Sequence, residues 1–412
     1  MNSRTSFFYG WVIVAVTIPV LMITAGIRSA PGAWIVPMKD DLGWSIASLS
    51  FAAAMGLIVY GFSGPLSGNL MRRFGVRNVV IISMLLSGLS MLLSSMVKTQ
   101  WQLTLFFGLF SGMATGLVAS VLGATVATRW FVKHRGLVVG MMGAAVSAGQ
   151  LVFFPLLTAW AVSMGWRTAA LILAGLCVAL VLPVLLFMRD DPEQIGLKPL
   201  GELESTTPAK AQADEAIMRR ALKSPDFWLL ALTFYICGAT SNGLVGQHFI
   251  PHAVDHGFSA QTAANTLALM GAFNFIGTIA SGWLTDRFDP RRLLLAYYGF
   301  RGLSLLFLPF IHDNLGIVAF AVLFGLDYIA TVPPTIALAA DTFGRKNVGV
   351  VYGWVFAAHQ VGAALSAWVA GLARDSFGDY ALAFYFAGAM AILGGLMALI
   401  IRRSSQVKTK LA

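Results

Sequence analysis

The sequence predicts an all-α membrane protein in which twelve transmembrane helices form two six-helix halves. Two observations lead to this fold class: apolar runs of about 20 residues recur from end to end, and one long polar interval divides them six and six. Of the 412 residues, 58% are hydrophobic and 11% are charged, whereas soluble domains carry about 25% charged residues. A run of about 20 apolar residues can cross the hydrocarbon core of a bilayer, which is roughly 30 Å thick.

The apolar runs predict helices rather than β-strands. Water cannot satisfy the backbone inside a bilayer, so only helices or a closed barrel can cross it. Barrel strands are about 10 residues long and alternate in polarity, whereas these runs are longer and do not alternate. The first run is too long for a removed signal peptide, and we interpret it as a membrane helix. The predicted spans are 8–29, 45–70, 78–97, 101–128, 136–163, 167–188, 226–253, 260–284, 292–311, 315–342, 348–373 and 381–401.

The polar interval at residues 189–225 predicts a linker between two domains. It contains Pro, Gly and mixed charges but few residues that could be buried, which is typical of connecting segments. We therefore expect an N-terminal six-helix half at residues 1–188 and a C-terminal half with its tail at residues 226–412.

The basic residues predict the orientation of the chain. Of the 28 Lys and Arg, 22 fall in the termini, the linker and the loops that follow even-numbered spans, four fall near the other loops and two fall within spans. Cytoplasmic loops are enriched in Lys and Arg, so we expect both termini and the linker to face the cytoplasm of a cell inner or plasma membrane. This placement accounts for the net charge of +10 without a nucleic-acid partner. We expect a monomer in a lipid bilayer.

A repeated loop supports the division into two related halves. "GWLTDRFDPR", Gly282 to Arg291, follows span 8, and "GNLMRRFGVR", Gly68 to Arg77, occupies the corresponding place after span 2. The Gly, the Asp–Arg pair and the basic end resemble the signature loop of the major facilitator superfamily. Arg72 stands at the Asp position of the first copy, and Asp289 stands at a Gly position of the second.

This resemblance implies a major facilitator fold and a gating role for the loops. Gly282 would let two helices touch, and small residues are suited to close contacts between membrane helices. Asp286 would sit at a helix terminus or pair with Arg287 or Arg291. Such contacts would form and break as the two halves rock. The corresponding gating residues of the first copy are Gly68 and Arg73.

Within that superfamily, three segments resemble the monocarboxylate and oxalate:formate antiporter branch. They are "FYGW" at 7–10 followed by Trp11, "TRWFVKHRGLVVG" at 128–140 and "SPDFWLL" at 224–230. They lie in both halves, so the resemblance covers essentially the whole chain. It implies transport of an organic anion.

The resemblance also identifies candidate binding positions. The branch carries an Arg in span 8, eight residues before the loop Asp, and the matching residue here is Thr278. Its acidic partner position matches Asn274. The span-11 Lys of the branch lies seven residues after a Tyr, and counting from Tyr352 gives His359. The span-1 Lys of some monocarboxylate carriers falls near Arg28. The usual positive charge of span 8 is therefore missing.

Charged residues inside spans are costly and are candidates for function. Arg28 lies near the outer end of predicted span 1, where it either extends to the interface or binds an anion in a central cavity. Arg301 and Asp327 fall near the middles of spans 9 and 10. They form either a structural ion pair or a site in which Asp327 binds a proton or cation.

Histidines in spans 7 and 11 supply further candidates. His248 and His252 have the i, i+4 spacing of a helical metal pair, but Pro251 should interrupt the helix between them, so we predict no metal site and a possible substrate contact for His248. His359 precedes Gln360 deep in span 11, where a histidine can bind an anion or carry a proton, or else make a hydrogen bond between helices.

Other polar and irregular positions complete the candidate set. Tyr328 belongs with the candidate binding residues, and weaker candidates are Gln150, Asn242 and Gln247. "ATVPPT" at 330–335 should bend span 10 and free backbone carbonyls. The Gly-rich stretch 108–123 predicts close helix packing rather than a phosphate loop. The two cysteines, Cys177 and Cys237, lie in apolar runs and should be free thiols.

The favoured hypothesis is a secondary active transporter of a small organic anion, a carboxylate, coupled to protons and working by alternating access. Arg28, His248, Asn274, Thr278, Tyr328 and His359 would bind the substrate, and His359 or Asp327 would carry the proton. We expect no cofactor, no ATP drive and no enzymatic activity. The alternatives are a proton-driven exporter of neutral or cationic drug-like compounds that uses Asp327, and a membrane sensor that does not transport.

Overall fold

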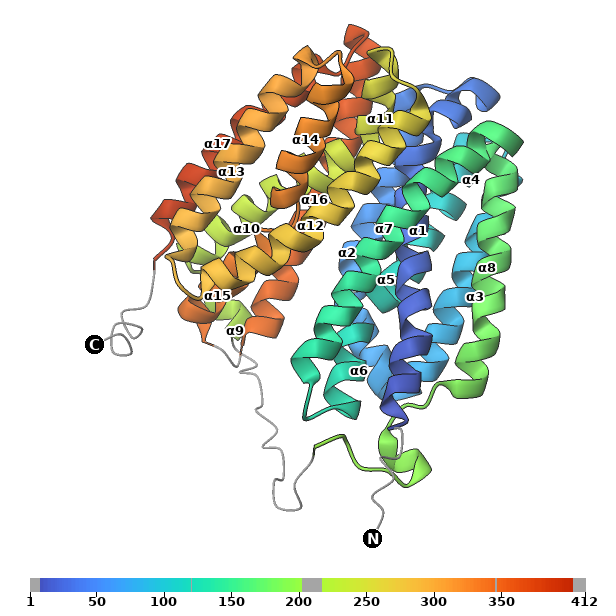
Figure 1. Cartoon of the computed structure of the whole chain (residues 1–412), viewed down its shortest axis with the longest axis vertical. Coiled ribbons are helices and arrows are strands. Elements are labelled where there is room, and N and C mark those ends of the chain that lie inside the picture. Colours follow the sequence, from blue (N-terminus) through green and yellow to red (C-terminus); the bar gives the residue numbers. More distant parts are fainter. Residues whose placement is uncertain (1–7, 120, 202–216, 345–346, 403–412) are drawn as a thin grey trace.

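A computed structural model describes residues 8–119, 121–201, 217–344 and 347–402. The chain is built from helices packed side by side (Figure 1). Among the described residues, twelve helical segments are long and apolar enough to cross a membrane. This confirms the predicted all-α class with twelve transmembrane helices.

The first six segments occupy residues 10–187. Within the fourth segment, a π-helical stretch at Thr104–Phe110 separates α4 from α5. The bounds are α1 Gly10–Leu42, α2 Ile46–Phe74, α3 Val76–Ser95, α4 Gln100–Leu103, α5 Ser111–Ala119, α6 Leu122–Trp130, α7 Arg135–Met164 and α8 Trp166–Phe187.

The remaining six segments occupy residues 225–400 and follow the short helix α9, Ile217–Leu222. A second π-helical stretch at Ala239–Val245 separates α10 from α11. The bounds are α10 Pro225–Gly238, α11 Gly246–Asp255, α12 Ala260–Thr285, α13 Pro290–Phe307, α14 Asn314–Asp327, α15 Val332–Phe343, α16 Val348–Phe377 and α17 Ala381–Ile400.

The predicted boundaries agree with the structure except at the end of the first span. The expected span 1 ends at residue 29, but α1 continues to Leu42 through Pro31 and Pro37. The continuation packs inside the protein, where Trp34 and Met38 are buried. Tertiary packing therefore keeps this segment helical beyond Arg28 despite its two prolines.

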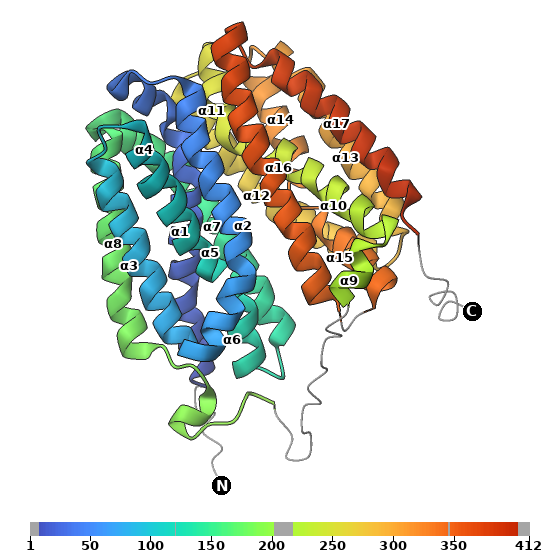
Figure 2. The same cartoon turned by 180° about the vertical axis from the view of Figure 1, so that it is seen from behind.

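The helices of residues 10–187 lie on one side of the molecule and those of residues 225–400 on the other (Figures 1 and 2). Three helix pairs join the two sides: α2 with α16, α7 with α12, and α1 with α11. The division of the chain into domains at residues 188 and 226 remains a prediction.

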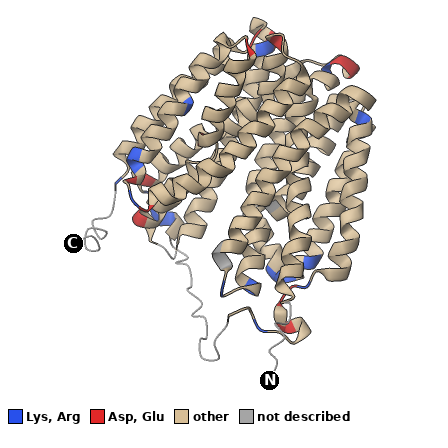
Figure 3. Ribbon diagram, in the orientation of Figure 1, with Lys and Arg blue, Asp and Glu red and all other residues tan. Residues whose placement is uncertain are grey.

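Two opposite faces of the molecule are useful for locating the site. The terminal face is the one where α1 begins, α17 ends and residues 189–201 lie, and the distal face is the one where α1 and α16 end (Figure 1). Most of the Lys and Arg lie at helix ends, with few inside the bundle (Figure 3). Residues 202–216 of the predicted linker and Arg345 and Lys346 lie outside the described residues.

Span 10 is broken where the sequence predicts a bend. α14 ends at Asp327 and α15 begins at Val332, so residues 328–331 form a turn inside the span. By contrast, the predicted interruption at Pro251 is wrong, because α11 continues through this residue. The irregular backbone of that span is instead the π-helical stretch Ala239–Val245. It ends directly before α11, the helix that contains Pro251.

Candidate functional site

Arg28 lies near the middle of α1, a 33-residue helix, rather than near its end as predicted. Its guanidinium Nη1 donates a hydrogen bond of 2.7 Å to the hydroxyl of Tyr60 on α2. The guanidinium carbon also lies 4.8 Å from the centre of the Tyr60 ring. Arg28 lines two small cavities, of about 30 and 20 Å³. The charge is therefore inside the protein, and it does not extend to the interface.

Polar side chains from both sides of the molecule line the smaller of these cavities. The smaller cavity is lined by Arg28 together with Gln150, Asn242, Gln247 and Tyr328. The Tyr328 hydroxyl donates a 3.1 Å hydrogen bond to Asn242 Oδ1, and Gln247 Oε1 is buried without a hydrogen-bond partner. The structure thus brings Arg28, Tyr328 and the three weaker candidates of the sequence together.

Arg28 differs from the arginines that form ion pairs in the structure. Within the described ranges, five arginines form ion pairs with carboxylates: Arg129, Arg167, Arg291, Arg301 and Arg374. The only polar side chain that bonds Arg28 there is the neutral phenol of Tyr60. A charge within a membrane protein is stabilised by a partner of opposite sign, so this geometry suits the binding of an anion.

Arg301 and Asp327 form a buried ion pair, the structural alternative of the sequence analysis. Arg301 Nε lies 2.7 Å from Asp327 Oδ2, and both side chains are at most 5% exposed. Arg301 Nη2 also donates to the carbonyls of Asp327 and Tyr328, at 2.9 and 3.1 Å. Both carbonyls lie at the break in span 10, so Arg301 links α13 to both the carboxylate and the broken backbone. Asp327 Oδ1 has no hydrogen-bond partner.

His359 lies on α16 between two aromatic rings, and it lines neither of the two cavities beside Arg28. Its ring centre is 4.7 Å from that of Phe234 and 5.7 Å from that of Phe356, with which it is stacked. The side chain is buried and Nδ1 has no hydrogen-bond partner. His359 packs against Gly238, where an added Cβ would lie 3.0 Å from the imidazole. The neighbouring Cys237 Sγ accepts a 3.0 Å hydrogen bond from Arg301, so His359 lies close to the Arg301–Asp327 pair.

Three predicted binding residues make helix contacts instead of meeting Arg28. His248 is fully buried, with Nε2 2.6 Å from the carbonyl of Ala367 and Nδ1 3.3 Å from the Tyr380 hydroxyl. Asn274 Oδ1 accepts hydrogen bonds from the Ile329 N–H, at 3.1 Å, and from Thr278 Oγ1, at 3.2 Å. Asn274 thus stabilises the turn inside span 10.

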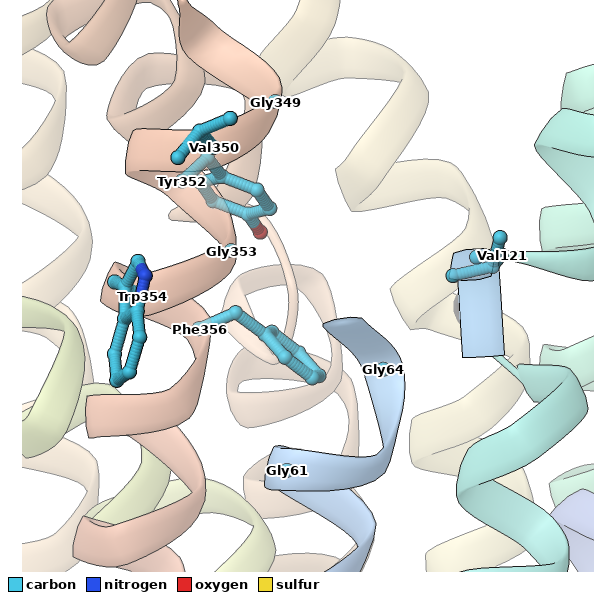
Figure 4. A pocket seen from close by; sticks show the side chains of 10 residues that line it. Gly61, Gly64, Val121, Gly349, Val350, Tyr352, Gly353, Trp354 and Phe356 are labelled. Atoms are coloured by element: carbon cyan, nitrogen blue, oxygen red, sulfur yellow. The ribbon is translucent and has the colours of Figure 1, made fainter. Parts of the chain in front are cut away.

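A larger cavity of about 510 Å³ lies between α2 and α16. α2 ends and α16 begins at the terminal face, so this cavity lies on that side of the molecule. Tyr352 and Phe356 project from α16 toward α2, where Gly61 and Gly64 offer only backbone (Figure 4). The lining residues are Gly61, Gly64, Gly68, Val121, Gly349, Val350, Tyr352, Gly353, Trp354 and Phe356.

At the distal face the two sides of the molecule are joined. The Asp375 carboxylate at the end of α16 accepts hydrogen bonds from the backbone N–H groups of Ile46 and Ala47, at 3.3 and 2.8 Å. It therefore caps the N-terminus of α2, which a carboxylate stabilises. Gly371 permits the close approach, because a Cβ there would lie 2.8 Å from Ser50 Oγ. The structure is thus closed at the distal face and hollow at the terminal face.

The gating candidates of the second loop lie at the terminal face and make few contacts. Asp286 caps the C-terminus of α12, as predicted, and its exposed carboxylate has no partner among the described residues. The predicted pairing of Asp286 with Arg287 or Arg291 is absent there. Arg287 lies over the Trp283 ring at 3.9 Å, and Arg291 pairs with Asp289 at 2.7 Å because both flank the start of α13.

The first loop shows a compensation that the sequence did not suggest. Asp190, from the segment after α8, accepts a 2.8 Å hydrogen bond from the backbone N–H of Arg77 at the start of α3. A carboxylate from elsewhere in the chain thus serves the loop whose own Asp position is Arg72. Arg73 lies over the Phe74 ring at 5.3 Å. A Cβ on Gly68 or Gly282 would meet nothing within 4 Å, so neither glycine forms the predicted close helix contact here.

In the part of the chain that the structure describes, no three His, Cys, Asp or Glu side chains are grouped to hold a metal ion. Cys177 and Cys237 are free and buried. The chemistry available near Arg28 is therefore reversible binding by one cation and several hydrogen-bonding groups.

Known proteins resemble this chain in both sequence and structure. The model of the Major Facilitator Superfamily matches residues 7–326 and 236–412. An uncharacterized MFS-type transporter, YcxA of Bacillus subtilis, is 26% identical over 95% of both chains. Monocarboxylate transporter 13 of Rattus norvegicus is 27% identical, and monocarboxylate transporter 11 of Homo sapiens is 26% identical. Each match covers 94% of this chain, and 87% and 82% of the two relatives.

Two solved structures share the fold. A D-xylose–proton symporter superposes with a TM-score of 0.76 at 16% identity, covering 95% of this chain and 98% of the symporter. A bacterial homolog of the human lysosomal transporter Spinster, in an inward-facing and occupied conformation, gives a TM-score of 0.74 at 14% identity, covering 96% and 97%. The chain belongs to the Major Facilitator Superfamily and is a multi-pass membrane transporter, not an enzyme, that resembles the monocarboxylate branch.

Proposed function

We propose that this protein is a secondary active transporter of a small organic anion, a carboxylate, coupled to protons and working by alternating access. The observation that carries the proposal is Arg28, a cation in mid-helix that contacts no carboxylate among the described residues. Side chains from both sides of the molecule surround it. A carboxylate bound there would receive the charge-assisted hydrogen bonds that Arg28 now directs to a phenol.

The surrounding groups suit the second oxygen of a carboxylate. Hydroxyls of Tyr60 and Tyr328 can donate hydrogen bonds, and the amide of Gln247 has one donor end and one acceptor end. The printed names of the relatives point to the same chemistry, since several are monocarboxylate transporters. Arg28 would then supply the fixed charge that the branch carries in span 8, where this chain has Thr278.

The one-sided cavity supports alternating access. The contacts of Asp375 with α2 join the distal face, and the 510 Å³ cavity occupies the terminal side. Rocking of the two halves would open the distal face and close the cavity at the terminal side. We propose that Asp286 gains a positively charged partner when the terminal face closes. Its carboxylate lies at the C-terminus of α12, where the helix dipole disfavours negative charge, and such a partner would relieve that cost.

We expect Asp286→Asn to slow turnover about tenfold and to change substrate affinity less than twofold. The substitution removes the charge that would stabilise the closed terminal face but touches nothing near Arg28. Uptake rates and equilibrium binding, measured on the same preparation, separate the two effects. Asp40→Asn, an exposed change near the end of α1 at the distal face, is the matched control. Full loss of affinity in a folded Asp286→Asn protein would contradict the gating role.

Proton coupling is proposed for His359, with Asp327 as the alternative. Each has one buried polar atom without a hydrogen-bond partner, Nδ1 and Oδ1 respectively. His359 stacks on Phe356, whose ring in turn lies 6.3 Å from the Tyr60 ring. A charge on the imidazole could therefore influence the Arg28 site through a short chain of packed rings.

We expect binding of a carboxylate that stays ionised from pH 5 to 8 to tighten as the pH falls. Histidine is the side chain that ordinarily gains its charge in this range, and an added positive charge favours an anion. His359→Gln should flatten the profile, while His359→Lys should retain tight binding and lose its pH dependence. Isothermal titration across the range checks this. A His359→Gln profile that matches the wild type removes His359 from the mechanism.

The second candidate function is export of neutral or cationic drug-like compounds. The apolar, aromatic lining of the large cavity favours it, but Asp327, its proposed proton site, is bonded to Arg301. A thermal-stability screen of the purified protein distinguishes the two, because ligands that bind the folded state raise its melting temperature. Carboxylates should stabilise the protein and aromatic amines should not. The reverse result would replace the anion proposal with the exporter.

The orientation, domain division and monomeric state are also proposals. We infer that both termini and residues 189–225 face the cytoplasm of an inner or plasma membrane, because the basic residues are concentrated there. A cysteine placed at Lys198 should resist an impermeant reagent added outside intact cells. Labelling from outside would contradict the inferred orientation. A mass of two chains measured by light scattering would contradict the monomeric state.

A further inference from the structure

We infer that the transported anion is an aryl or arylalkyl carboxylate, whose carboxylate binds Arg28 while its flat apolar body occupies the 510 Å³ cavity. The inference rests on the proposed anion transport and adds the class of substrate. It depends on the size of the cavities, on their lining and on the contact that joins them.

The cavities beside Arg28 are small compared with the cavity between α2 and α16. The two cavities lined by Arg28 measure about 30 and 20 Å³. The cavity between α2 and α16 is far larger, at about 510 Å³. A two- or three-carbon acid would leave most of that space without contacts, and unfilled apolar space contributes no binding.

The lining of the large cavity suits a planar ring. Tyr352 and Phe356 project from α16 toward α2, and Gly61 and Gly64 present only backbone to them (Figure 4). No Asp, Glu, Lys or Arg is among the ten described residues that line it. Aromatic side chains bind other rings by offset stacking or edge contacts. A slot with one aromatic wall and one backbone wall therefore favours a flat, uncharged body.

The Tyr60 and Phe356 rings connect the large cavity to Arg28. Tyr60 holds Arg28 through its hydroxyl at 2.7 Å, and its ring centre lies 6.3 Å from that of Phe356, which lines the cavity. Gly61, the next residue, also lines the cavity. The phenol oxygen occupies the position that a carboxylate oxygen would take on Arg28. A substrate whose ring entered beside Phe356 could displace Tyr60 and bring its carboxylate to the guanidinium.

The test compares three probes by isothermal titration: 3-phenylpropionate, propionate and the neutral 3-phenylpropanol. For the wild type we expect 3-phenylpropionate to bind at least tenfold more tightly than either of the others, because only this probe offers both a charge and a ring. Equal affinity for propionate and 3-phenylpropionate would overturn the inference.

Two substitutions place a new side chain in the cavity. A Cβ on Gly353 or on Gly349 would meet nothing within 4 Å, and both glycines line the cavity. Gly353→Leu and Gly349→Leu should each weaken 3-phenylpropionate at least tenfold and change propionate less than twofold. Gly175→Leu on α8, where a Cβ would also meet nothing within 4 Å, is the matched control. Unchanged 3-phenylpropionate binding in both cavity variants would overturn the inference.

Arg28→Gln separates this inference from the proposed function. In one outcome, Arg28→Gln abolishes binding of both carboxylate probes while the two leucine variants have no effect. That result would support anion binding at Arg28 and reject the proposal that the substrate has an aryl body. Unchanged binding of both carboxylates in Arg28→Gln would reject the proposed function itself.

Discussion

Arg28→Gln is expected to reduce carboxylate uptake about 100-fold. Hydrogen bonds to a charged group contribute about 1.5–3 kcal/mol, and about 3 kcal/mol corresponds to roughly a 100-fold change in an equilibrium constant. Glutamine keeps a donor near Tyr60 but removes the charge that the surrounding helices leave without a carboxylate. Arg28→Lys should recover part of the activity, because it restores the charge without the planar pair of donors.

Initial uptake rates in proteoliposomes measure this effect. Arg292→Gln makes the same chemical change at an exposed position on α13 and should leave uptake unchanged. The melting temperature of Arg28→Gln should stay at or above that of the wild type, since an intramembrane charge is removed. Uptake by a folded Arg28→Gln protein within threefold of the wild type would contradict the role of Arg28.

Arg301→Met is expected to destabilise the protein by about 3–5 kcal/mol, the usual cost of leaving one member of a buried ion pair alone. The substitution strands the Asp327 carboxylate, which is 4% exposed, and removes donors from two carbonyls in the broken span. Asp327→Leu should cost a similar amount, because it strands the guanidinium. The double variant should recover most of the loss, since neither charge remains.

A double-mutant cycle of unfolding free energies checks this expectation. An interaction energy above about 2 kcal/mol supports a pair whose role is structural. Single variants that unfold within about 0.5 kcal/mol of the wild type would contradict that role. They would leave Asp327 free to exchange protons and strengthen the exporter alternative.

Much of the fold could be predicted because a bilayer imposes a simple rule on sequence. A backbone in lipid needs a helix at least about 20 residues long, and the predicted ends of eleven of the twelve spans agree with the structure. The exception, α1, shows its limit. Arg28 and Pro31 look like the end of a span, yet Trp34 and Met38 beyond them are buried by neighbouring helices, and that packing is a tertiary property.

The candidate site was only partly predictable. Arg28 stood out because a charge in an apolar run has few explanations. Tyr60 and Phe356 carried no such signal, because aromatic residues are common in membrane helices. Asn274 was identified by its family position, but its amide accepts the Ile329 N–H freed by the broken span. This hydrogen bond depends on how spans 8 and 10 face each other, and the sequence does not show that arrangement.

Counterflow in proteoliposomes tests the central claim, carrier-mediated transport of a carboxylate at Arg28, most directly. Vesicles loaded with unlabelled 3-phenylpropionate are diluted into the labelled compound at equal pH on both sides, so that passive leak of the acid cannot concentrate the label. We predict a transient accumulation of label above its final level in wild-type vesicles and none in Arg28→Gln vesicles. Identical time courses for the two proteins, or accumulation of an aromatic amine in place of the carboxylate, would contradict the claim.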